Sequence, residues 1–130
     1  MLPAPERAGA ACTPNIDPSG RRRRAMLGIV ALAGAALAAT WLLARGAAPA
    51  AALPLAIPLF VGLLGLLQAR ASTCVAFAAR GLRAEGGSVT PLSADELGPV
   101  RRQARRVTRD ATAGTLLLTL LFVALLAVTR

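Results

Sequence analysis

The chain has 130 residues, a formal net charge of +9 and no histidine. All fifteen basic residues are arginine, and 55 % of the residues are hydrophobic. The lack of histidine removes the commonest metal ligand and the usual proton carrier near neutral pH. A chain of this length holds one small domain, and the placement of its apolar residues decides the class of that domain.

Three charge-free apolar segments organise the sequence, at residues 25–44, 47–69 and 111–128. Each has about the 20 residues that a helix needs to cross a hydrocarbon layer about 30 Å thick. A buried helix of a soluble protein is the alternative, but three such helices would need a large soluble protein around them. The segments therefore predict an all-α integral membrane protein with three transmembrane helices.

The arginines are distributed unevenly around these segments. Thirteen of the fifteen precede the first segment or lie between the second and the third, and only Arg45 and Arg130 lie elsewhere. Basic flanks stay on the cytoplasmic side during insertion. We expect a multi-pass protein with its N-terminus inside and its C-terminus outside. The alanine-rich, all-arginine composition favours a bacterial cytoplasmic (inner) membrane.

Residues 1–24 are rich in proline, alanine and glycine and show no apolar period, which predicts a disordered basic cytoplasmic tail. An alternative interpretation takes Arg23 and Arg24 with the apolar segment that follows as an export signal, cleaved after Ala50. A second apolar segment follows directly, which favours an uncleaved anchor. Cys12 and Cys74 both fall on the predicted cytoplasmic side, where thiols stay reduced.

Residues 70–110 are predicted to form a basic cytoplasmic helical hairpin. Apolar residues at three- and four-residue spacing continue the second helix to about Leu82, and the glycines at 86–87 break it. Ser93 and Glu96 match a capping box that starts a new helix. That helix is predicted to run directly into the third span, with one apolar side made of Val100, Ala104, Val107 and Ala111.

Five arginines occupy the opposite arc of this helix: Arg101, Arg102, Arg105, Arg106 and Arg109. They are candidates for contact with a partner protein or with lipid headgroups. The simplest alternative is that they only keep the loop inside the cell. Nucleic acid is disfavoured as a partner, because no aromatic residues for base stacking interleave with the arginines.

Two groups of residues are candidates for helix packing. Small residues on one face of the first span would let helix backbones approach closely, and these are Ala31, Gly34, Ala35 and Ala38. Hydroxyl groups follow one side of the third span, at Thr108, Thr112, Thr115 and Thr119. They can bond a neighbouring helix or the carbonyl one turn back in their own helix. The remaining alternative is that they line a polar path.

No ionisable residue lies within the three predicted spans, and we find no motif of an enzyme. Two cysteines without histidine make a poor zinc site. We therefore expect no catalysis, no cofactor and no metal. The leading hypothesis is a non-catalytic accessory, scaffold or assembly subunit of a larger membrane complex. The alternatives are a small oligomeric pore or transport component, and an anchor that binds anionic lipid or nucleic acid through its arginines.

Overall fold

The structure is a computed structural model that describes residues 14–130 and is mostly helical (78 %). The prediction for residues 1–13 lies outside the described part of the chain. The elements follow the order α1 (Pro18–Ala44), η1 (Pro49–Leu55), α2 (Ala56–Ala71), α3 (Val75–Arg80), β1 (Leu82–Glu85), β2 (Ser88–Pro91) and α4 (Ala94–Val128).

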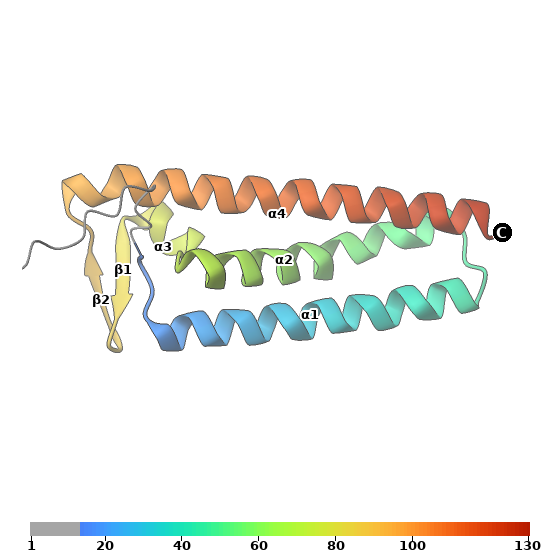
Figure 1. Cartoon of the computed structure of the whole chain (residues 1–130), viewed down its shortest axis with the longest axis horizontal. Helices are drawn as coiled ribbons and strands as arrows, with labels where there is room; N and C mark the ends of the chain where they lie inside the picture. Colours follow the sequence, from blue (N-terminus) through green and yellow to red (C-terminus); the bar gives the residue numbers. More distant parts are fainter. Residues whose placement is uncertain (1–13) are drawn as a thin grey trace, which may run out of the picture.

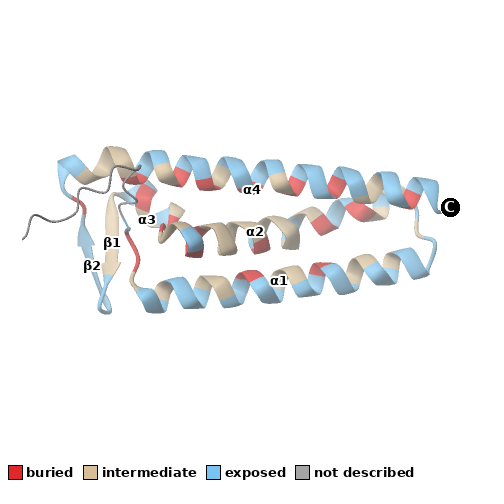
Figure 2. Cartoon of the chain, viewed as in Figure 1, coloured by how far each residue is buried: buried red, intermediate tan, exposed pale blue. Residues whose placement is uncertain are grey.

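The long helices lie side by side along one axis, with α2 between α1 and α4 (Figure 1). Within residues 14–130, three segments are long and apolar enough to cross a membrane: Pro18–Ala44, Pro49–Ala71 and Ala94–Val128. Only 11–22 % of their most apolar windows is buried inside the protein, so most apolar side chains point outward (Figure 2). Such a surface suits lipid rather than water. The chain is a multi-pass membrane protein.

Helix α1 begins at Pro18, seven residues before the predicted start, so Arg21–Arg24 are helical and do not belong to a disordered tail. Asp17 is the N-cap, and its Oδ1 accepts the Gly20 N–H at 2.8 Å. Proline suits the first helical position. The Gly20 N–H and the Ser19 hydroxyl favour the charged carboxylate, which lowers the pKa of Asp17.

The second span is not one regular helix over 47–69. Its first part is the 3-10 helix η1, which contains Pro54, and the α-helix begins at Ala56. Proline removes a helical hydrogen bond, which accounts for the irregular part. At the other end α2 stops at Ala71, because Ser72 adopts a left-handed conformation (φ 51°).

The prediction that this helix continues to about Leu82 was therefore wrong. The backbone groups that would continue it have other partners. The Ser72 carbonyl accepts the Asn15 N–H at 3.0 Å, and the Cys74 N–H donates to Asn15 Oδ1 at 2.6 Å. A segment 59 residues away in sequence thus ends the helix.

Helices α1 and α2 approach most closely where glycines face each other. A Cβ on Gly28 would lie 2.8 Å from the Gly62 carbonyl oxygen, and one on Gly65 would lie 2.9 Å from the Arg24 carbonyl oxygen. Of the predicted packing face, Ala35 is buried, and Ala31 and Ala38 are half-buried. Gly34 is exposed, and nothing lies within 4 Å of its ideal Cβ position.

The predicted helical hairpin over 70–110 is not confirmed. Where the first helix of the hairpin was predicted, the structure has only α3, with six residues. Where the hairpin was predicted to turn, it has an antiparallel pair of strands, β1 and β2, with Glu85 opposite Ser88. Gly86 (φ 57°) and Gly87 (φ 81°) connect the strands. A two-residue turn with positive φ at both positions matches the twist of a hairpin, and glycine adopts it without strain.

Helix α4 confirms the predicted helix that starts at the capping box and continues into the third span. It runs without interruption for 35 residues from Ala94 to Val128, and the Glu96 carboxylate accepts the Ser93 N–H at 3.1 Å in a capping box. Its predicted apolar side is buried, with exposed fractions of 0–7 % at Val100, Ala104, Val107 and Ala111. A small core joins α4 to α3 and to the end of the strand pair, made of Ala78, Leu92, Val100 and Ala104 with Val75 and Leu97 around them.

Candidate functional site

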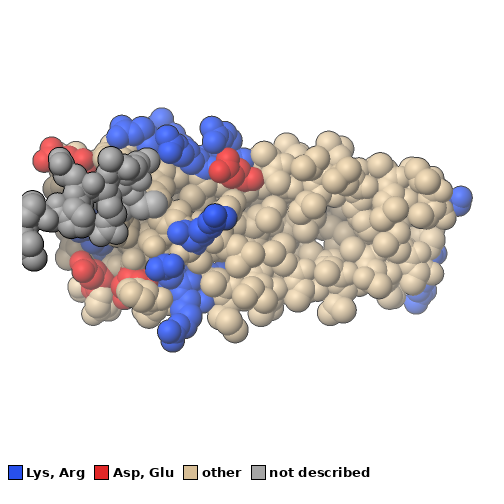
Figure 3. All heavy atoms as spheres, in the orientation of Figure 1, with Lys and Arg blue, Asp and Glu red and all other residues tan. Residues whose placement is uncertain are grey.

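Arginines gather at one end of the bundle, around α3, the strands and the first half of α4 (Figure 3). We call this region, residues 14–24 and 68–110, the basic end. The other end carries Arg45 and Arg130. There the Arg45 guanidinium carbon lies 4.9 Å from the centre of the Trp41 ring, a cation–π arrangement.

Asn15 connects three parts of the basic end. Its side chain is fully buried; Nδ2 donates to the Cys74 carbonyl at 3.0 Å, and Oδ1 accepts the Cys74 N–H. Its backbone N–H donates to the Ser72 carbonyl, and its carbonyl accepts the Ala84 N–H of β1 at 2.9 Å. We call this set, Asn15 with Ser72, Cys74 and Ala84, the Asn15 latch.

Two arginines of α1 reinforce the latch. Arg24 Nη1 donates to Gln68 Oε1, and Arg24 Nη2 donates to Cys74 Sγ, both at 2.9 Å. Arg21 Nε donates to the Ala69 carbonyl at 3.0 Å. Cys74 is 2 % exposed. The sequence suggested a topological role for these arginines, or for Arg24 a place in an export signal. In the structure both arginines connect α1 to the end of α2 through hydrogen bonds.

An ion pair ties the strands to the start of α4. Arg83 Nη2 lies 2.6 Å from Glu96 Oε1, and the Leu92 N–H donates to the Gly81 carbonyl at 2.8 Å. The Ser93 N–H, followed by the Arg83 side chain, favours the charged carboxylate and lowers the pKa of Glu96.

We expect a carbon-detected NMR titration of Glu96 to have its midpoint below the ordinary pKa of 4.5. The lowered pKa stabilises the fold above pH 4.5, and this contribution is lost as the pH falls through the folded-state pKa. Arg83→Gln should raise the midpoint but leave it below 4.5, because the Ser93 N–H remains. A midpoint fully restored to 4.5 by Arg83→Gln would contradict the larger role of Ser93.

A groove of about 570 Å³ lies between α3 and α4. Its floor consists of small and apolar residues, and one rim carries arginines at four-residue spacing. The floor residues are Val75, Ala78, Ala79, Ala104 and Thr108, and the rim residues are Arg101, Arg105 and Arg109. We call this the arginine-rimmed groove. The structure thus divides the predicted arc, because Arg102 and Arg106 do not line the groove. We call Arg102 and Arg106 the outer pair.

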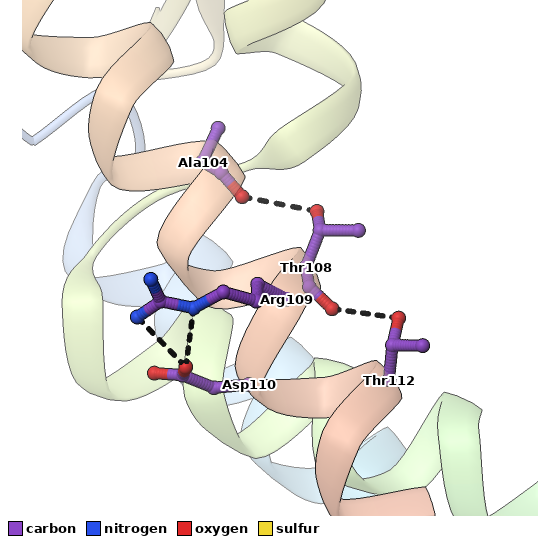
Figure 4. A network of polar contacts seen from close by, with 5 residues as sticks. All are labelled: Ala104, Thr108, Arg109, Asp110 and Thr112. Carbon is purple, nitrogen blue, oxygen red and sulfur yellow. Dashed lines mark hydrogen bonds and ion pairs between the residues drawn. The ribbon is translucent and has the colours of Figure 1, made fainter. Parts of the chain in front are cut away.

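All five arginines of the arc are exposed. Arg101 Nε donates to the Ala78 carbonyl at 3.4 Å, and Arg109 pairs with the neighbouring Asp110 at 3.3 Å (Figure 4). Within residues 14–130, four arginines of the arc have no acidic side chain within ion-pair distance: Arg101, Arg102, Arg105 and Arg106. The arc therefore presents positive charge that the described chain does not neutralise.

The threonines of α4 mostly bond within their own helix. Thr108 Oγ1 donates to the Ala104 carbonyl and Thr112 Oγ1 to the Thr108 carbonyl, as Figure 4 shows, and Thr115 Oγ1 donates to the Ala111 carbonyl. Thr119 is buried, and its Oγ1 has no partner among the described residues. Thr112 and Thr115 also line an apolar pocket of about 320 Å³ against α2.

The three apolar helices and the charged end define a small multi-pass helical membrane protein with one strongly basic end. Comparison with protein-family models, with curated proteins and with solved structures gives no match. Over the described part of the chain, no group of three or more His, Cys, Asp or Glu is placed to hold a metal ion.

Proposed function

We propose that this protein is a non-catalytic accessory, scaffold or assembly subunit of a larger complex in a bacterial cytoplasmic membrane. Its basic end lies in the cytoplasm, and its C-terminus lies outside. The observation that carries the proposal is the arc of exposed arginines on α4, four of which lack an acidic partner among the described residues. Unneutralised charge on a fixed surface attracts and orients an acidic partner.

Helix α4 holds the arginine arc in a fixed position, which supports this role. Helix α4 is continuous from the arc into the third span, so the arginines and the membrane anchor form one piece. The Asn15 latch and the core around Val100 hold the rest of the basic end against it. A partner that binds the arc is thereby held at a set height and direction relative to the bilayer.

Arg102 is the member of the outer pair best placed for a protein partner. Arg102 lies nine residues before Ala111, which is about 13 Å at the rise of an α-helix. The headgroup layer is about 5–8 Å thick on each side of the hydrocarbon. Arg102 therefore stands beyond the headgroups, where an acidic segment of another protein can reach it.

The proposal is tested by mild-detergent purification of the full-length protein and of two charge-matched double variants. Arg102→Gln with Arg106→Gln removes the outer pair, and Arg22→Gln with Arg23→Gln removes two exposed arginines of α1. We expect a membrane partner in fixed ratio to the wild type, bound roughly two- to thirty-fold more weakly by the outer-pair variant. The α1 variant should keep the partner.

Two outcomes would overturn the accessory role. One is equal recovery of the partner with both variants, which would remove docking through the outer pair. The other is a protein that purifies alone as a homo-oligomer and makes liposomes leak ions, which would favour a pore. Reporters after Arg130 and at Gly87 test the orientation separately, because only the first should be active in the periplasm.

A further inference from the structure

The membrane end of the arginine-rimmed groove, at Arg105 and Arg109, lies at the depth of the lipid headgroups. The charge-free part of α4 begins at Ala111, and Arg109 and Arg105 precede it by two and six residues. At the rise of an α-helix these residues stand about 3 Å and about 9 Å from that boundary. The headgroup layer extends about 5–8 Å from the hydrocarbon, so both flexible side chains reach it. The groove therefore faces lipid phosphates.

The chemistry of the groove suits a headgroup with a phosphate. Guanidinium groups bind phosphate through paired, charge-assisted hydrogen bonds. The floor residues Val75, Ala78 and Ala104 make an apolar wall beside the arginines. Charge of one sign beside a low-dielectric wall attracts counter-ions more strongly than an open surface does. The groove volume of about 570 Å³ is in the range of sites for small ligands.

We propose that the arginine-rimmed groove binds the headgroup of one anionic phospholipid, with its phosphate between Arg105 and Arg109. The lipid enters from the membrane end, and the rest of its headgroup lies over the small residues Ala78 and Ala79. This inference does not depend on the accessory role, because it uses the groove rim and not the outer pair.

The carboxylate of Asp110 is the nearby competitor for Arg109. Its Oδ1 lies 3.3 Å from both Arg109 Nε and Nη2. Both side chains of this pair are more than half exposed, and exposed pairs of this kind are weak. A phosphate held by two guanidinium groups replaces the contact, so Asp110 lowers the affinity for the lipid without blocking the groove.

The test uses purified full-length protein in phosphatidylcholine vesicles that contain a trace of spin-labelled phosphatidylglycerol or phosphatidylcholine. Electron paramagnetic resonance measures how much of each labelled lipid is immobilised at the protein. We expect the wild type to prefer phosphatidylglycerol. Arg105→Gln with Arg109→Gln should lower that preference at least about five-fold, since each arginine near a membrane surface contributes about that factor.

Two further variants separate the groove from general charge attraction. Arg102→Gln with Arg106→Gln removes the same charge at the same spacing outside the groove and should lower the preference less than the groove variant does, because Arg102 stands beyond the headgroups. Ala79→Trp fills the groove without changing any charge and should lose it, provided that the helical circular dichroism is kept. If the charge variants fold poorly, Ala79→Trp alone tests whether the lipid preference depends on the groove.

Three results would overturn the proposal. The first is a wild type without preference for phosphatidylglycerol. The second is an equal loss in the groove and outer-pair variants, which indicates diffuse attraction by net charge. The third is loss of the preference in millimolar inorganic phosphate at constant ionic strength, which assigns the groove to a free anion. Failure of the partner purification would leave these outcomes unchanged.

Discussion

Gly28→Ala is expected to push α1 and α2 apart and to lower the free energy of unfolding by about 1–3 kcal/mol. The added Cβ would lie 2.8 Å from the Gly62 carbonyl oxygen and 3.0 Å from the Leu66 nitrogen. Both neighbours are backbone atoms of α2, so no side-chain rotation relieves the clash. Close approach of helix backbones is a main source of packing energy in membranes, so the loss affects the whole pair. The measurement is the unfolding midpoint in mild detergent, followed by helical circular dichroism.

Gly34→Ala is the matched control on the same helix. Nothing lies within 4 Å of the ideal Cβ position of Gly34, and this residue is exposed. Alanine favours the helix over glycine by up to about 1 kcal/mol, so this variant should be as stable as the wild type or slightly more stable. A loss at Gly34 equal to that at Gly28 would show that the helices do not pack through the glycines of α1 and α2.

Local spacing made part of the fold predictable. The charge-free segments, the capping box of Ser93 and Glu96 and the apolar side of α4 all depend on residues within a few turns of each other. The contact of Gly28 with Gly62 was not predictable from the sequence. Many small residues on α1 could lie at a close helix contact, and the position of α2 decides which of them does. The glycines at 86–87 did carry a hairpin signal. The four-residue strands beside them are too short to show a clear alternation.

The candidate site was predictable to the same extent. Helical spacing identified the arc of five arginines, but the division of that arc depends on where α3 packs, and α3 begins after a turn that Asn15 imposes. The hydrogen bonds of Arg21 and Arg24 were not predictable either, because their acceptors lie 44–50 residues away in sequence. The earlier start of α1 had a local signal in the Asp17–Pro18 pair, a cap residue followed by proline.

Asn15→Ala is expected to release the basic end locally while the apolar helices stay folded. The change leaves the buried N–H of Cys74 without a partner and removes one of the two hydrogen bonds to its carbonyl, which still accepts the Ala78 N–H. Each buried polar group left unpaired costs about 1–3 kcal/mol. The turn after α2 and the start of β1 should therefore open more often, because regions open according to their local stability.

The thiol of Cys74 reports this opening directly, since it is 2 % exposed in the closed form. The chain has two cysteines, so a Cys12→Ser background leaves Cys74 as the only thiol. Asn15→Ala should raise the rate of maleimide labelling at Cys74 by more than about ten-fold, as expected for a loss of about 2 kcal/mol of local stability. The helical circular dichroism should change little.

Ser19→Ala is the control from the same N-terminal segment, because the Ser19 hydroxyl donates to Asp17 Oδ1 at the exposed start of α1, away from the Cys74 turn. This variant should label as slowly as the wild type. Slow labelling of Asn15→Ala as well would mean that the bonds of Arg21 and Arg24 to the end of α2 hold the turn closed without Asn15. Rapid labelling of Asn15→Ala, with Ser19→Ala unchanged, would show that one buried amide fixes the turn from which α3 and its side of the arginine-rimmed groove begin.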